Sequence, residues 1–217
     1  MIDLHTHTFF SDGELVPSEL VQRAYAAGYT AIALTDHTDS SNIEFIVPAM
    51  VKVTDDLNRH CNIKAIPGVE LTHVPPDMIG TLTSLARRLG ARLVIVHGET
   101  IAEPVREGTN MAAIRAGVDI LAHPGLISDE AVCLARDLGV TLEITARKGH
   151  SLTNGHVARK ALEFGVPLVI NSDTHSPGDL IHKDFAVSVL LGAGIPSGKV
   201  GDIFKQSELI VSKVFSK

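Results

Sequence analysis

Short runs of Ile, Val and Leu recur along the chain, separated by stretches with the apolar spacing of amphipathic helices. This alternation is typical of βα units on a parallel sheet. Closing such units into a ring predicts an α/β fold, a seven-stranded (β/α) barrel of the TIM-barrel kind. The seven strands are expected at Ile2–His7, Ala31–Asp36, Ile63–Glu70, Leu93–His97, Ile120–His123, Thr141–Thr145 and Leu168–Asp173.

Helices are expected between these strands, several of them ending at a glycine such as Gly28 or Gly139. The 217 residues suit one domain, and no linker or low-complexity segment divides them, so we expect a single barrel domain over residues 1–217. The expected helices are Pro17–Ala27, Glu44–Leu57, Thr81–Leu89, Met111–Ala116, Asp129–Leu138, His156–Phe164, Ala186–Leu191 and Lys199–Gln206.

Polar side chains stand at or just after the ends of six of the seven predicted strands. Since the carboxyl ends of parallel barrel strands surround one mouth, these side chains should converge on one cleft. They are His7, Asp36-His37, Glu70, His97, His123 and Asp173 through His175.

Two pairs of metal-type side chains lie near the two ends of the chain. His5 and His7 are two positions apart, and so are Asp173 and His175. Side chains alternate along a strand with period two, so both members of each pair should face the same side. One such pair is a weak signal, but two of them predict a polynuclear metal site.

Composition narrows the function classes. The formal net charge is −6, and Lys and Arg are spread thinly, which disfavours long nucleic acid as a partner and leaves small anionic substrates. No apolar run approaches the roughly 20 residues of a membrane helix, and the N-terminus lacks the pattern of a signal peptide. We therefore expect a cytoplasmic protein without membrane contact, of undetermined oligomeric state.

Six segments together resemble the PHP family, the polymerase and histidinol phosphatase superfamily of metal-dependent phosphoesterases. The resemblance spans nearly the whole chain, and the family's fold is a distorted seven-stranded barrel. The segments are Asp3-Leu4-His5-Thr6-His7 with Ser11-Asp12-Gly13, Thr35-Asp36-His37, Gly68-Val69-Glu70, Val96-His97-Gly98-Glu99, Ala122-His123-Pro124-Gly125 and Ser172-Asp173-Thr174-His175.

The resemblance implies nine ligands for two to three divalent ions. His5, His7, Glu70 and Asp173 would hold the first ion, and Glu70, His97 and His123 the second. Asp12, His37 and His175 would hold the third, although some relatives have a histidine in place of Asp12. Nitrogen and oxygen donors without cysteine suit Zn²⁺, Mn²⁺ or Fe²⁺.

The implied activity is hydrolysis of a small phosphate monoester, as in a histidinol phosphatase. A hydroxide bridging two metals would attack phosphorus while the cations neutralise the phosphoryl oxygens. Asp173 and His175 are the expected catalytic residues, and His175 or a metal-bound water could protonate the leaving oxygen if a metal does not stabilise it.

The sixth predicted strand supplies no ligand, but Arg147 follows it and shares its inward face with Glu143 and Thr145. A guanidinium grips phosphate through two donors, so Arg147 is the candidate phosphate-binding residue, with Lys148 and His150 as neighbours that could serve instead.

Three further residues carry open interpretations. Glu99 is either a support for the ligand His97 or a solvated loop acid. His73 and His182 should lie near the mouth, where either could touch substrate.

Other functions fit the same motifs. The site could instead act as a phosphodiesterase, an exonuclease, a nucleotide phosphatase or a phosphotyrosine-protein phosphatase. A metal-binding scaffold without turnover is a different class, and amide hydrolysis on a related barrel is a third, disfavoured because no lysine stands at a predicted strand end.

Overall fold

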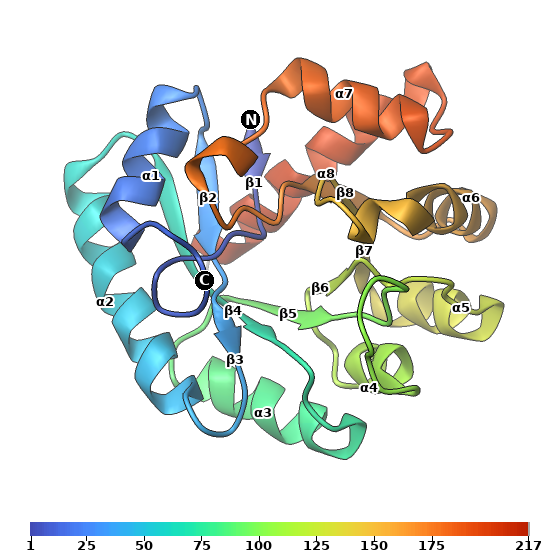
Figure 1. Ribbon diagram of the computed structural model, residues 1–217, viewed down its shortest axis with the longest axis horizontal. Coiled ribbons are helices and arrows are strands. Elements are labelled where there is room, and N and C mark those ends of the chain that lie inside the picture. Colours follow the sequence, from blue (N-terminus) through green and yellow to red (C-terminus); the bar gives the residue numbers. More distant parts are fainter. Residues whose placement is uncertain (217) are drawn as a thin grey trace.

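The computed structural model describes residues 1–216 as parallel strands surrounded by helices (Figure 1). The predicted distorted seven-stranded (β/α) barrel is confirmed, with the order β1-β2-β4-β5-β6-β7-β8 and parallel pairing between neighbours. The strands are β1 (Ile2–Asp3), β2 (Ala31–Leu34), β4 (Lys64–Leu71), β5 (Leu93–His97), β6 (Ile120–Ala122), β7 (Thr141–Thr145) and β8 (Leu168–Asn171), and the short β3 (His37–Thr38) pairs with the far end of β4.

The helices lie outside the strands, one α-helix between each two successive strands of the ring and two after β8 (Figure 1). Most predicted helices are close to their observed positions, but α3 begins at Pro76 instead of Thr81, because proline is well accepted in a helix's first turn. The helices are α1 (Pro17–Ala26), α2 (Ile43–His60), α3 (Pro76–Arg88), α4 (Thr109–Arg115), α5 (Asp129–Leu138), α6 (Asn154–Phe164), α7 (Lys183–Gly192) and α8 (Ser197–Phe215). In the described part of the chain, none of them combines the length and apolar character needed to cross a membrane.

The barrel interior is a compact apolar layer. Inward side chains of five strands and the segment after β1 pack together there, and Val211 and Val214 of α8 join them. The predicted helix at Lys199–Gln206 was too short, since α8 runs on to Phe215 and this extra length brings its valines to the barrel. The strand residues of this layer are Leu4, Ala31, Ala33, Ile66, Leu93, Ile95, Ile120, Ala122 and Val169.

Side chains complete the seam between β1 and β8. One parallel bridge joins Thr6 to Thr174. The amide of Leu4 donates to Asn171 Oδ1 over 2.9 Å, and the amide of Ser172 donates to Asp3 Oδ2 over 3.1 Å. These bonds hold the first and last strands together, so the two ends of the motif set lie side by side.

Several strands end earlier than predicted, just before the donor residues. β1 stops at Asp3 because the following amides turn to side chains: that of Thr6 donates to Thr35 Oγ1 over 3.0 Å. β4 and β5 include the predicted ligands Glu70 and His97, and the short β3 includes His37, while β6 and β8 end before theirs. At the mouth of the barrel, the backbone hydrogen bonds between strands are thus replaced by hydrogen bonds to side chains.

Candidate metal centre

Four buried donors form the first cluster, drawn from the segments after β1 and β8 and from β4. His7 Nε2 lies 3.2 Å from Asp173 Oδ1 and 3.6 Å from Glu70 Oε2. His5 Nε2 lies 3.4 Å from Glu70 Oε1. All four residues are at most 2% exposed. The predicted first ligand set therefore comes together out of contact with bulk solvent.

The backbone at the end of β8 turns sharply to deliver this cluster. Asp173 has a φ of 55°, a left-handed conformation that side-chain-bearing residues seldom adopt. The amide of His7 donates to the carbonyl of Thr174 over 2.8 Å, which fixes the two predicted pairs against each other.

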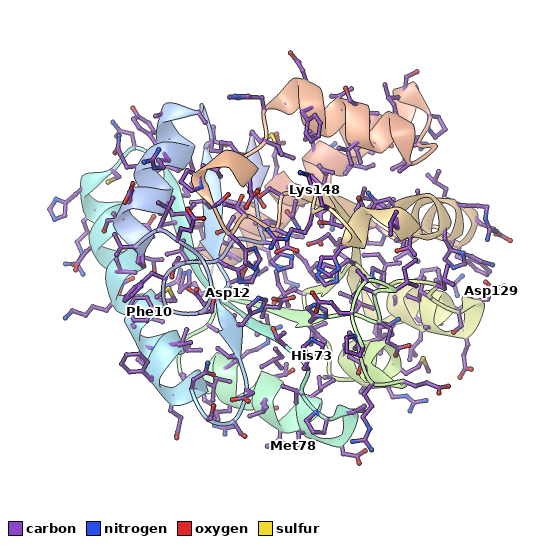
Figure 2. The ribbon with its side chains drawn as sticks, in the orientation of Figure 1. Phe10, Asp12, His73, Met78, Asp129 and Lys148 are labelled. Carbon is purple, nitrogen blue, oxygen red and sulfur yellow. The ribbon has the colours of Figure 1, made fainter. Side chains whose placement is uncertain are left out.

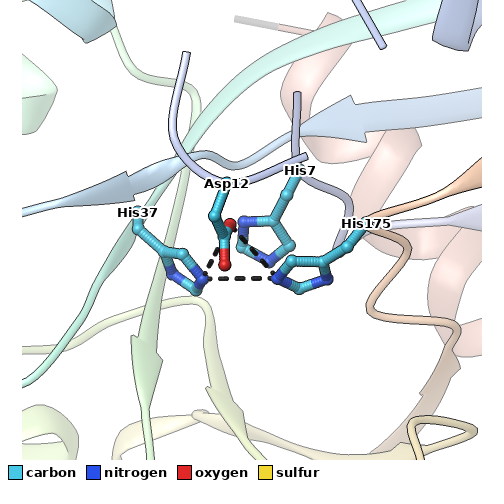
Figure 3. A group of neighbouring side chains, drawn as sticks. All are labelled: His7, Asp12, His37 and His175. Carbon is cyan, nitrogen blue, oxygen red and sulfur yellow. Dashed lines mark hydrogen bonds and ion pairs between the residues drawn. The ribbon is translucent and has the colours of Figure 1, made fainter. Parts of the chain in front are cut away.

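Asp12, His37 and His175 form the next cluster at the mouth, with His7 beside them (Figure 3). Asp12 Oδ1 lies 3.4 Å from His37 Nε2 and 3.3 Å from His175 Nε2, and the two imidazole nitrogens are 3.4 Å apart. The predicted third ligand set is therefore also assembled. His7 faces both clusters, whereas the sequence placed it in the first alone.

A tight loop returns Asp12 to the mouth. Asp36 Oδ1 accepts from the amide of Thr8 over 2.7 Å and from the hydroxyl of Ser11 over 2.7 Å. At Gly13 a Cβ atom would stand 2.5 Å from the carbonyl oxygen of His7, so a side chain there would push the loop away. Asp36, noted in the sequence only as a polar strand end, thus organises the loop.

The cluster predicted to hold the second ion has additional titratable neighbours. His123 Nε2 lies 3.8 Å from Glu70 Oε1, and the rings of His97 and His123 meet edge to face with centroids 4.4 Å apart. His97 Nε2, however, also lies 3.2 Å from Oε2 of Glu103, a loop residue that the sequence analysis did not single out. His150 stacks on His123 with centroids 4.2 Å apart.

Glu70 stands at the centre of all three clusters. Besides His5, His7 and His123, its carboxylate contacts His37, whose Nδ1 lies 2.6 Å from Oε2. The resemblance implied a bridge between the first two ions only. Because Glu70 contacts Nδ1 of His37, the Nε2 of that ring is left facing Asp12.

The buried charges of the centre depend on each other. Burial would raise the pKa of Glu70, but His5 and His37 hold it well below its usual value. Burial would lower the pKa of His37, yet Glu70 and Asp12 raise it to about 10. Burial and the neighbouring His37 lower the pKa of His7 to about 3. The carboxylates thus stay ionised and attract cations.

Glu143 is a functional candidate that motif reasoning missed. It is fully buried on β7, and its Oε2 accepts from His5 Nδ1 over 2.8 Å and from Asn171 Nδ2 over 2.9 Å. A carboxylate on the second nitrogen of a histidine is the usual support of a metal-ligating imidazole. The inward alternation of β7 was the signal that could have identified it.

The predicted substrate-binding residues lie in different environments. Arg147 is one-third exposed, and its Nη1 lies 3.4 Å from the Asp173 carbonyl and 3.4 Å from Asp179 Oδ2. Lys148 is exposed at the rim (Figure 2), and His150 is buried in the histidine cluster. The structure therefore separates the three neighbours instead of presenting them together.

The remaining open residues can also be placed. Glu99 neither contacts His97 nor points freely into solvent, because its Oε1 accepts from the Asn110 amide at the start of α4 over 2.8 Å. His73 lies over the mouth with its Nε2 3.2 Å from Glu103 Oε2 (Figure 2), and His182 is an exposed residue just before α7.

The donor set fits divalent cations. Two donors about 2.1 Å from a tetrahedral ion are roughly 3.4 Å apart, close to the spacings in these clusters. Among the described residues, several buried polar atoms have no hydrogen-bond partner, which is costly unless a cation meets them. Those in the clusters are His5 Nε2, both nitrogens of His7, Glu70 Oε1, His123 Nδ1 and Asp173 Oδ1, and the others are Glu143 Oε1, Thr83 Oγ1 and Ser207 Oγ.

The fold and the donor clusters define a (β/α) barrel protein of the metal-binding class. A family model described as PHP domain matches residues 3–122, and the chain belongs to this family. An uncharacterized protein of Methanocaldococcus jannaschii is 50% identical over 195 residues, covering 89% of each chain. A protein of Thermoanaerobacter sp. named probable phosphatase is 26% identical over 98% of this chain and 95% of its own.

A solved structure agrees with the fold. The "putative histidinol phosphatase" of Listeria monocytogenes superposes with a TM-score of 0.59 at 13% identity, covering 83% of this chain and 97% of that one. The family match confirms the resemblance stated from the motifs and, at the level of the family, the expectation of a phosphoesterase.

Proposed function

We propose that this protein hydrolyses a small phosphate monoester at a centre of two to three divalent ions, Zn²⁺, Mn²⁺ or Fe²⁺. The observation that carries the proposal is the convergence of all nine predicted donors, with unpartnered buried atoms aimed among them. A relative named probable phosphatase, matched along nearly its whole length, supports the same activity.

The chain's own residues have distinct parts in this proposal. His5, His7, Glu70 and Asp173 would hold one ion, with Glu70, His97 and His123 around a second and Asp12, His37 and His175 around a third. When bound, such ions acidify water and neutralise phosphoryl oxygens. Asp173 and His175 are the proposed catalytic residues. When the third ion is absent, Nε2 of His175, whose side chain is 13% exposed, would instead be free to give a proton to a leaving oxygen.

Arg147 is the proposed phosphate-binding residue. Its guanidinium reaches the backbone of Asp173, beside the first cluster, and two-thirds of the side chain is buried. We expect Arg147→Ala to raise KM about 10- to 100-fold, because a charged hydrogen bond contributes about 1.5–3 kcal/mol, while kcat changes less. Steady-state kinetics with the best substrate, compared with the exposed Arg159→Ala variant, measures this.

Two outcomes would redirect this assignment. If Lys148→Ala raises KM and Arg147→Ala does not, the phosphate contact belongs to Lys148. If neither changes KM, neither of these two residues grips the phosphate.

One observation favours a substrate with a flat ring. Phe9 and Phe45 are 63% and 67% exposed, and Phe10 lies between them with ring centroids 5.9 Å from each. Phe9 and Phe10 stand between His7 and Asp12 in the chain. A nucleotide or a short phosphodiester is therefore the second candidate, since aromatic faces stack on bases.

The test is a phosphate-release assay with added Mn²⁺ or Zn²⁺. The panel would contain histidinol phosphate, nucleoside monophosphates and phosphotyrosine, and cleavage of a dinucleotide would be followed separately by chromatography, because hydrolysis of a diester releases no free phosphate. The control would be the His5→Ala and His7→Ala double variant. We expect release from a monoester by the wild-type protein alone. Equal phosphate release by both proteins would exclude the metal centre as the site of catalysis. Hydrolysis of none of these substrates would favour the non-catalytic scaffold.

A further inference from the structure

Three side chains that are not among the nine predicted ligands lie around the second cluster: His73, Glu103 and His150. Glu103, on the loop between β5 and α4, contacts three imidazoles at once. Its Oε2 lies 3.2 Å from Nε2 of both His73 and His97, and its Oε1 lies 3.5 Å from His150 Nε2. His97, His123 and His150 each present a ring nitrogen within 4.8 Å of the others, and all three are buried.

Hydrogen bonds orient these rings toward a common space. The carbonyl of Gly98 accepts from His97 Nδ1 over 3.2 Å, so in the neutral ring the lone pair is on Nε2, facing Glu103. The Thr100 hydroxyl lies 2.8 Å from His150 Nδ1 and holds that edge, leaving Nε2 toward Glu103. A lone pair and a carboxylate oxygen at 3.2 Å repel each other unless a cation or a proton lies between them.

The backbone keeps the two loops in this arrangement. A Cβ at Gly125 would stand 1.7 Å from the Glu99 carbonyl oxygen, so the base of the Glu103 loop is packed against the segment after β6. At Gly149 a Cβ would meet Ala102 at 3.4 Å, so the tip of that loop lies against the residue before His150. Both extra donors are therefore placed by close packing.

We propose that His150 and Glu103 are additional donors to the cation held by His97 and His123. The spacings of 3.2 and 3.5 Å are close to the roughly 3.4 Å expected between two donors that each lie about 2.1 Å from one ion, and together with Glu70 the set would make that ion five-coordinate. Glu103 is 41% exposed on its side chain, so it is the donor that an anionic substrate can displace. This inference rests on the metal centre of the proposed function and adds to its ligand set.

Metal binding without substrate tests the inference. Metal-free protein would be titrated with Co²⁺ against a chelator, and the visible spectrum of the loaded protein recorded. We expect His150→Ala and His150→Gln to weaken one bound ion by at least about tenfold and to change the cobalt bands, because an imidazole donor is lost. Glu103→Gln should weaken the same ion. His60→Ala, an exposed histidine at the end of α2, is the matched control.

Each result has a separate meaning. If both His150 variants fold, as judged by circular dichroism, and keep the wild-type ion count, affinities and spectrum, the inference is wrong and a shared proton explains the contacts. If His150→Ala loses an ion while the wild-type protein hydrolyses no phosphate ester, the inference stands and the proposed activity fails. A wild-type protein that binds no divalent ion overturns both.

Discussion

Replacing Glu70 by glutamine should abolish most phosphate release and lower the number of bound ions. The carboxylate contacts four imidazoles that belong to all three clusters, so no other side chain can supply its charge to them together. Divalent ions contribute several kcal/mol of transition-state stabilisation, and 1.36 kcal/mol is a factor of ten, so we expect a loss of about 10³-fold or more in kcat. Phosphate release and elemental analysis of the purified variant measure both effects.

The metal-free protein offers a second measurement for this variant. Glu70 is the first of the groups that raise the pKa of His37 to about 10, so the pKa of His37 should fall in Glu70→Gln. Titration of the imidazole by NMR records the change. Glu44→Gln makes the same chemical change at an exposed position of α2 and should behave as wild type. A Glu70→Gln protein with wild-type ion content would contradict the central place of this carboxylate.

The position of Glu70 shows what local pattern can predict. The run before it is mostly apolar and contains Ile63, Ile66 and Val69, and the end of a parallel barrel strand lies at the barrel mouth. The same logic placed His97 and His123, and each lies there. Strand position follows from hydrophobic periodicity, so it was available from the sequence.

The outer donors follow from loop packing, which sequence periodicity does not encode. Glu103 and His150 lie on segments whose positions depend on close approaches at Gly125 and Gly149, contacts between residues distant in the chain. The length of α8 was missed for a related reason, because its final turns are stabilised by the barrel interior instead of by local propensity. Tertiary contacts decided each of these features.

Glu143→Gln should weaken metal binding at the first cluster, because Glu143 supports the donor His5. Glu143 Oε2 accepts from both His5 Nδ1 and Asn171 Nδ2, and burial is complete. Glutamine keeps the shape but removes the charge that supports the His5 ring. Loss of such a carboxylate typically lowers metal affinity 10- to 100-fold, and we expect that range for one ion in a chelator competition.

The same substitution should also lower the free energy of unfolding. If the new amide group turns its NH₂ toward Asn171, two donors face each other in a buried space, which costs about 1–3 kcal/mol. Asn171 Oδ1 meanwhile accepts from the Leu4 amide and closes the seam between β1 and β8, so displacement of Asn171 loosens the barrel itself. Urea unfolding of the metal-free protein measures this loss, and Glu163→Gln on the exposed face of α6 is the control. Unchanged stability together with unchanged affinity would mean that His5 needs no carboxylate behind it, and that Asn171 keeps its place in the seam without the charge of Glu143.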